Sequence, residues 1–331
     1  MTEGKLSIRL PWQDQQWQRL STAYEADTLP HAILLAGPKG IGKQRFAEAF
    51  AQRLLCESPV QGSACGECRQ CHFICAGSHP DLKKVSPEES GKQIKIDQVR
   101  RLVESFGHTA QQGGFKVAVL SPAESMNINA ANALLKCLEE PTANTLLILI
   151  SDAPSQLLPT IRSRCQLVNF PLPSDAVVKE WLAGLAPSQS PIEQLVLEAA
   201  GQPMTALALL ENNGLEQRKQ LLDDFLMLLS GRQSALSVAD KWQQFDLRDI
   251  LLWLAGKISA LISSRYAADS GEVAPAIKAL SKSMPLISSK NLFLLLDQMV
   301  ALRVSLERGA NPNKLLALEN LLLDCCEKNH S

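Results

Sequence analysis

Residues 34–50, LLAGPKGIGKQRFAEAF, decide how the first half of the chain is expected to fold. The apolar start predicts a short buried strand, and the segment that follows the glycines predicts a helix. The turn between them matches the phosphate-binding pattern G-x-x-x-x-G-K-[ST] at Gly37, Gly42 and Lys43. Gln44 stands where a Ser or Thr hydroxyl would coordinate magnesium. The stretch therefore predicts the shape of a nucleotide-binding loop that lacks one of its metal ligands.

Further strand signals follow the loop along the chain. KVAVLS from Lys116 and TLLILIS from Thr145 each have the length and composition of a buried strand. Between them, NAANALLKCLEEP predicts a helix that Pro141 ends. Strands that alternate with helices predict a mainly parallel sheet covered on both faces, with ligands at the carboxyl ends of its strands. After about Phe170 every segment predicts helix.

Composition limits the class of protein. The 331 residues are 46% hydrophobic and 20% charged, which is typical of a globular chain of two or three domains. The net charge of −1 gives no overall basic field for nucleic acid. The N-terminal stretch is polar and no run of 18 apolar residues occurs, so we expect a cytoplasmic protein without a membrane segment. Nine cysteines in such a chain indicate metal ligands or buried thiols.

Four of these cysteines have the spacing of a metal site. Cys56, Cys65, Cys68 and Cys71 form C-x8-C-x2-C-x2-C, and four thiolates suit a closed tetrahedral zinc shell without a catalytic position. We therefore predict a structural Zn²⁺ that folds an insertion of about residues 56–75. Three nearby side chains could substitute as ligands: Cys75, His72 and His79. A rival interpretation makes the module a nucleic-acid reader, although CGECRQCHFIC has only one Arg and one Phe.

Taken together, these motifs resemble a known family. HAILLAGPKGIGK, the four-cysteine insertion, AANALLKCLEEP and LLPTIRSRCQLV occur in the order found in the AAA+ subunits of the bacterial DNA polymerase III clamp loader. The resemblance covers essentially the whole chain. It implies a RecA-like AAA+ core with the zinc insertion at residues 1–170, a small helical lid at 171–213, and an all-α C-terminal collar at 214–331.

The chain departs from the ATP-hydrolysing members of this family at three positions. Their acidic Walker B pair falls here on Ser121 and Pro122, which cannot hold magnesium as carboxylates do, and Glu124 is displaced by two residues. The lid arginine of their G-x-x-R sequence aligns with Met204. Together with Gln44, these changes remove metal ligation, water activation and one charge clamp, on which phosphoryl transfer depends. We expect no intrinsic ATPase, and ATP binding is doubtful, so Gly37, Gly42 and Lys43 are interpreted as a vestigial site.

One catalytic element of the family is retained. In the resembled subunits the sequence SRC presents its arginine to ATP bound by a neighbouring subunit, and here it falls on Ser163, Arg164 and Cys165. The resemblance therefore implies that Arg164 acts in trans, with Arg162 as the weaker candidate. An arginine supplied in this way stabilises the charge that develops during phosphoryl transfer.

The resemblance implies a non-hydrolysing clamp-loader subunit of the DNA polymerase III holoenzyme, which works in DNA replication as part of a hetero-oligomer. The implied partners are the gamma/tau and delta subunits, with the sliding clamp and primed DNA reached through the complex. The alternatives are an active clamp-loader ATPase of the gamma/tau type, in which Gln44 and Glu124 take over the missing contacts, and a zinc-knuckle nucleic-acid-binding protein.

Overall fold

The computed structural model describes residues 6–89, 92–112, 114–266, 275–285, 287–307, 310 and 312–330. The chain divides into two compact units, Met1–Leu207 and Ala208–Ser331. The first unit is built around a sheet and the second is helical, and each has a hydrophobic core of its own.

The sheet of the first unit has five parallel strands in the order β2-β3-β4-β1-β5. Their bounds are β1 Ala32–Ala36, β2 Leu82–Val85, β3 Lys116–Leu120, β4 Thr145–Ser151 and β5 Gln166–Asn169. β4 and β1 are central, and every residue of β1, β3 and β4 is buried. Because all strands run in one direction, the segments that follow β1, β3 and β4 emerge at the same edge of the sheet.

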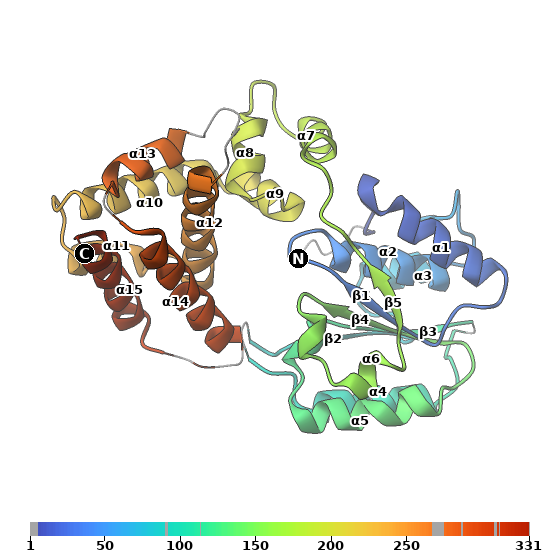
Figure 1. Ribbon diagram of the computed structural model, residues 1–331. Helices are drawn as coiled ribbons and strands as arrows, with labels where there is room; N and C mark the ends of the chain where they lie inside the picture. The colour runs from blue at the N-terminus through green and yellow to red at the C-terminus, as the bar shows by residue number, and fades with distance from the viewer. Residues whose placement is uncertain are drawn as a thin grey trace. The chain divides into compact units, whose positions relative to one another are not determined.

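Side chains of the central strands alternate between two cores. Ile33 and Leu35 face one core together with Phe46 of α2 (Lys43–Leu55), whereas Leu34 faces the other core together with Leu134 of α5 (Ile128–Glu139). Helices α1 (Asp14–Glu25) and α2 cover the first face of the sheet, and α4 (Ile96–Gly107) and α5 cover the second (Figure 1). Burial on both faces explains why these strands read as continuous apolar runs.

The helices of the first unit alternate with the strands, and three follow the sheet, of which the last, α9, continues past the end of the first unit at Leu207. Their bounds, with three short 3-10 helices η1 to η3, are η1 Pro11–Gln13, α1 Asp14–Glu25, α2 Lys43–Leu55, α3 Arg69–Cys75, α4 Ile96–Gly107, η2 Ala123–Ser125, α5 Ile128–Glu139, η3 Pro154–Gln156, α6 Pro159–Arg162, α7 Asp175–Ala183, α8 Ile192–Glu198 and α9 Pro203–Glu211.

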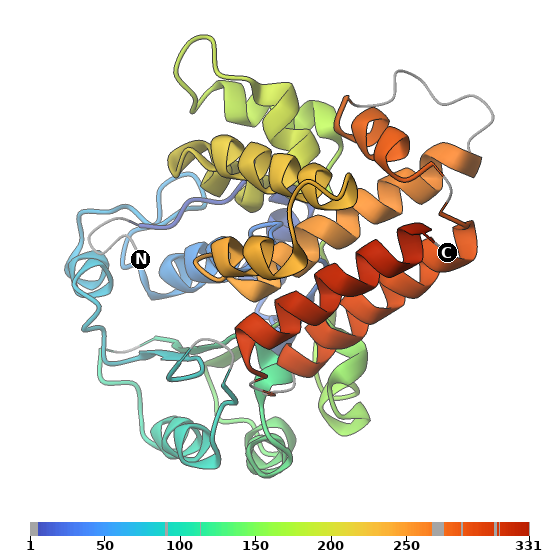
Figure 2. The same cartoon turned by 90° about the vertical axis from the view of Figure 1, so that its left-hand side faces the viewer.

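The second unit contains helices only among its described residues. They are α10 Gly214–Leu229, α11 Ala235–Trp242, α12 Leu247–Tyr266, α13 Pro275–Ser283, α14 Ser289–Glu307 and α15 Lys314–His330. Trp242 and Phe225 are fully buried in its core. α14 packs against both α12 and α15, and Figure 2 shows α14 and α15 lying side by side.

The predicted fold class is confirmed: the chain has a RecA-like α/β core that carries the cysteine cluster, and the described residues after β5 form helices without a further strand. The three strands predicted from apolar runs are β1, β3 and β4. β2 and β5, which lie at the two edges of the sheet, were not predicted. In the part of the chain that the structure describes, no helix is both long enough and apolar enough to cross a membrane.

Candidate functional site

The loop between β1 and α2 has the backbone that its glycines predict. Gly42, the residue before α2, has a φ of 85°, a left-handed value that favours glycine. A Cβ at Gly42 would lie 2.3 Å from Cδ1 of Leu10, and one at Gly37 would lie 2.2 Å from the carbonyl oxygen of Phe170. The two predicted glycines are therefore required by the packing of this loop against its own unit.

Lys43 is buried and its ammonium group is bound entirely by the protein. Nζ donates to the carbonyl oxygens of Gly37 and Pro38, each at 2.7 Å, and to Oδ1 of Asp152 at 2.6 Å. The Lys43 side chain is 3% exposed and that of Asp152 is 36% exposed. A lysine ammonium has three donors, and these contacts account for all three. A phosphate group would have to displace at least one of them to bind this lysine.

The carboxylates near the loop do not stand where a Walker B pair would. Ser121 and Pro122 follow β3, as predicted, and Glu124 lies in the η2 turn beyond them. Oε1 of Glu124 accepts a hydrogen bond from the backbone N–H of Asp152 at 2.9 Å, and Oε2 is buried without a hydrogen-bond partner. Glu124 and Asp152 thus join the segments that follow β3 and β4, and Asp152 is paired with Lys43.

Gln44 is engaged on its own helix. Its side-chain amide donates to Oε1 of Glu48, one turn further along α2, at 3.1 Å. Glu48 also accepts from the hydroxyl of Ser7 and from Lys84, which pairs with it at 2.8 Å. The residue in the magnesium-ligand position of the motif is therefore part of a surface network.

Two segments of the first unit cover the loop. The ring N–H of Trp12 donates to the carbonyl of Ile41 at 3.0 Å, and the side chain of Gln13 donates to the carbonyl of Gly42 at 3.0 Å. On another side, the backbone N–H of Met204 donates to the carbonyl of Gly40 at 2.8 Å. Met204 occupies the predicted lid-arginine position, and what it supplies to the loop is a backbone hydrogen bond.

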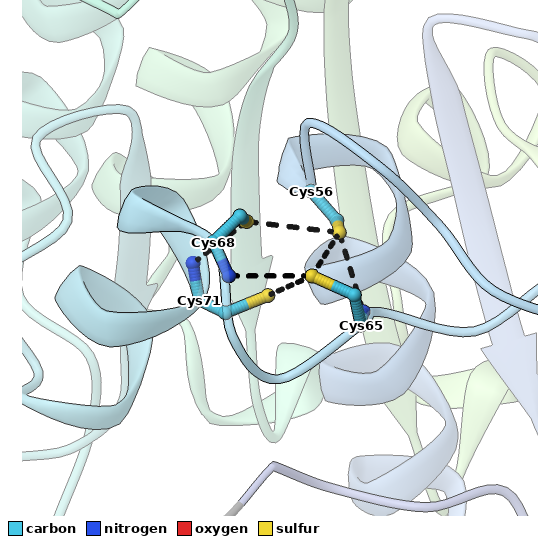
Figure 3. Close-up of side chains that lie close together, drawn as sticks. All are labelled: Cys56, Cys65, Cys68 and Cys71. Atoms are coloured by element: carbon cyan, nitrogen blue, oxygen red, sulfur yellow. Dashed lines mark hydrogen bonds between the residues drawn. The ribbon is translucent and has the colours of Figure 1, made fainter.

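The four predicted thiols come together in the first unit (Figure 3). Cys56 follows α2, Cys65 lies in a loop, Cys68 precedes α3 and Cys71 lies within α3. Their Sγ atoms all lie within 4.8 Å of one another, and three sulfur pairs are separated by 3.5, 3.8 and 3.9 Å. Four sulfurs about 2.3 Å from a tetrahedral zinc ion would be separated by about 3.8 Å, so this donor set fits zinc.

The surroundings of the thiols differ. Backbone hydrogen bonds from Glu67 and Cys68, together with a weaker one from the side-chain hydroxyl of Ser58, lower the pKa of Cys65 to about 6. Burial raises the pKa values of Cys56 and Cys71. No other group of three or more metal-binding side chains was found among the described residues, so Cys75, His72 and His79 stand outside the cluster. Nδ1 of His79 instead accepts a hydrogen bond from the backbone of Asp81.

Arg164 follows α6 and its guanidinium is held by two groups. Nη2 lies 2.9 Å from Oε1 of Glu139, the last residue of α5, and Nη1 donates to the carbonyl of Thr160 at 3.1 Å. The Arg164 side chain is 37% exposed. Arg162 is exposed, and its side chain makes no hydrogen bond or ion pair within the described part of the chain.

Two residues of these sites were missed by the sequence analysis: Asp152 and Glu139. Asp152 directly follows a predicted strand, and such positions collect at the functional edge of a parallel sheet, so this signal was present. Glu139 lies inside the motif AANALLKCLEEP, but its pairing with Arg164 depends on how α5 packs near α6. Nothing in the spacing of these two residues indicated that contact.

The sheet order, the glycine loop after β1 and the helices on both faces define the class of the first unit as a RecA-like AAA+ core. Two protein-family models match the sequence. The family described as "DNA polymerase III, delta subunit" matches residues 12–174, and the family described as "DNA polymerase III, delta subunit, C terminal" matches residues 212–326. A DNA polymerase III subunit delta' from Pseudomonas aeruginosa is 40% identical over 319 residues, covering 95% of this chain and 96% of the relative. The subunit delta' of Haemophilus influenzae is 35% identical over 268 residues, which cover 78% of this chain and 79% of the relative.

The chain belongs to the DNA polymerase III delta-prime subunit family. The structure can be superposed on a crystal structure of a gamma subunit-related DNA polymerase III protein from Thermotoga maritima. The match covers 95% of this chain and 99% of the Thermotoga chain, with a TM-score of 0.50 and 19% sequence identity. That likeness concerns the fold. The predicted resemblance to the clamp-loader subunits of DNA polymerase III is therefore confirmed.

Proposed function

We propose that the chain is a non-hydrolysing clamp-loader subunit that helps to place a sliding clamp on primed DNA during replication. Its partners would be the gamma/tau and delta subunits, and it would donate Arg164 to ATP bound by one neighbour. Residues 1–170 would form the AAA+ core, 171–213 the lid and 214–331 the collar of the assembly. Membership of the delta-prime family supports the role, and the state of the loop supports its passive character.

The observation that carries the proposal is the state of Lys43. In a working phosphate loop this lysine reaches the β- and γ-phosphates. Here its donors are taken by two loop carbonyls and by Asp152, and Gln44 is bound to Glu48. Magnesium would find no carboxylate directly after β3, because Ser121 and Pro122 occupy those positions. These features favour a loop that serves the packing of the unit over one that binds Mg-ATP.

The rival ATPase would need Gln44 and Glu124 to hold magnesium and orient water. Gln44 donates to a carboxylate of its own helix, and Glu124 accepts from the backbone of Asp152. Both would have to abandon existing partners, so this rival is the weaker proposal.

The nucleic-acid rival is weaker for a similar reason. The guanidinium of Arg69 lies 5.2 Å from the ring centre of Phe73, and His79 meets the same ring edge-on. The aromatic side chain that could stack on a base is half-buried and already contacts these two side chains of the chain itself. We propose instead that Cys56, Cys65, Cys68 and Cys71 hold a structural zinc ion, which would crosslink the insertion when bound.

Arg164→Ala in a reconstituted clamp-loader complex tests the proposed function. At the site that receives it, an arginine acting in trans supplies a factor of roughly 10³–10⁵ in rate, so DNA-stimulated ATP hydrolysis should fall sharply while assembly is retained. Arg162→Ala is the matched control, because it removes a neighbouring exposed arginine, and it should leave hydrolysis near the wild-type rate. Unchanged hydrolysis with Arg164→Ala in a fully assembled complex would refute the role of this arginine.

A further inference from the structure

The side chain of Arg164 is supported by two rigid elements of the first unit. Thr160, whose carbonyl accepts a hydrogen bond from Nη1 of Arg164, lies in α6. Ile161 and Cys165, which lie in the same segment before and after Arg164, are buried. Glu139 ends α5, which is anchored by four buried residues and capped at its N-terminus by the side chain of Asn127. The positions of both groups that hold the guanidinium are therefore fixed by the core.

The contacts leave the guanidinium able to bind something else. An arginine side chain has five N–H donors, and the contacts with Glu139 and Thr160 use two of them. The Arg164 side chain is 37% exposed and that of Glu139 is 50% exposed. Three donors thus remain for a phosphate group while Glu139 keeps its contact.

The strength of the ion pair decides whether Glu139 orients the Arg164 guanidinium or withholds it from a nucleotide. A half-exposed ion pair shifts an equilibrium by a factor of about five at most. That is too little to withhold an arginine from a triphosphate, which carries several charges and accepts bidentate hydrogen bonds. It is enough to favour one conformation of a long and flexible side chain.

We propose that Glu139 is a positioning residue, which orients the Arg164 guanidinium for a nucleotide bound by the neighbouring subunit. The inference rests on the proposed function of Arg164. Glu139 does not touch the nucleotide itself. Its contribution is made through the arginine, in the transition state and not in the binding of ATP.

Glu139→Ala in the reconstituted complex is the test. Loss of the orienting carboxylate should lower kcat for DNA-stimulated ATP hydrolysis by about threefold to fivefold, with KM for ATP unchanged. Glu139→Gln keeps an acceptor oxygen without the charge and should recover part of the rate. Glu140→Ala is the matched control: Glu140 is the next residue, is exposed, and forms no ion pair among the described residues.

A double variant separates positioning from a merely structural effect. In an Arg164→Ala complex, adding Glu139→Ala should change kcat no further. An equal loss in both backgrounds, an unchanged kcat, or a raised kcat with Glu139→Ala alone would each overturn the positioning role. If Arg164→Ala itself has no effect, the proposed function fails first and this inference falls with it.

Discussion

Lys43→Met distinguishes a structural lysine from a nucleotide-binding one. In the structure Nζ makes three short contacts inside the protein, and the lysine side chain is almost fully buried. Methionine preserves most of the volume of the stem but leaves the carbonyls of Gly37 and Pro38 and the carboxylate of Asp152 without this donor. We therefore expect the substitution to destabilise the first unit in the absence of any nucleotide.

The expected loss of stability in Lys43→Met follows from the environment of the three acceptors that lose their donor. Removing one partner of a buried ion pair costs about 3–5 kcal/mol, and a hydrogen bond to a charged group contributes about 1.5–3 kcal/mol. Asp152 is 36% exposed and can be rehydrated, which places the effect near the lower end, at about 3 kcal/mol. This corresponds to a change of about a hundredfold in the equilibrium for opening the unit.

Hydrogen exchange of the full chain, read by mass spectrometry, measures this change locally. Peptides from α2 should exchange about a hundredfold faster in Lys43→Met at their slowest sites, whereas peptides from α12 in the second unit serve as the internal reference. Lys39→Met is the matched control, since Lys39 is exposed in the same loop and its side chain makes no hydrogen bond or ion pair with the described residues.

The opposite pattern would contradict a structural role for Lys43. If Lys43 were kept for ATP, millimolar Mg-ATP would protect α2 in the wild type, and Lys43→Met would abolish that protection without loss of stability. Wild-type exchange rates in Lys43→Met without nucleotide would show that the three contacts contribute nothing.

Two further predictions concern the first unit. Fresh protein should contain one zinc ion per chain. Cys68→Ser should abolish zinc binding and destabilise the unit by no more than the roughly 10–16 kcal/mol that zinc contributes to small sites, whereas Cys75→Ser should retain the metal. Zinc-free fresh protein would contradict this prediction. Burial lowers the pKa of His79, with Asp81 opposing the shift and Lys83 adding to it. Because the unfolded chain then binds more protons, stability should fall as pH falls below about 6.5, by no more than about 1.4 kcal/mol per pH unit, and His79→Asn should flatten this dependence in urea unfolding; identical pH slopes would contradict the assignment.

The parts of the fold that could be predicted are those whose signal is local. β1, β3 and β4 are buried on both faces and therefore consist of apolar residues throughout. β2 contains two exposed lysines, Lys83 and Lys84, and β5 exposes Leu167. Charged side chains on an edge strand such as β2 protect a sheet from pairing with other chains, and they also remove the apolar pattern by which a strand is recognised.

The candidate sites divide in the same way. The cysteine cluster could be predicted because four ligands fall within 16 residues, and the glycine loop because its conformation needs glycine at fixed positions. The pairing of Lys43 with Asp152 spans 109 residues and arises from the neighbouring positions of β1 and β4. The contact of Glu139 with Arg164 likewise depends on helix packing. Such contacts require the tertiary structure.

The most direct test of a loop that does not serve ATP hydrolysis is ATP turnover by the isolated chain with magnesium. Such a loop predicts no turnover above a protein-free blank and no saturable binding of Mg-ATP, in the wild type and in Lys39→Met alike. Steady hydrolysis by the wild type that Lys43→Met abolishes and Lys39→Met leaves intact would contradict it.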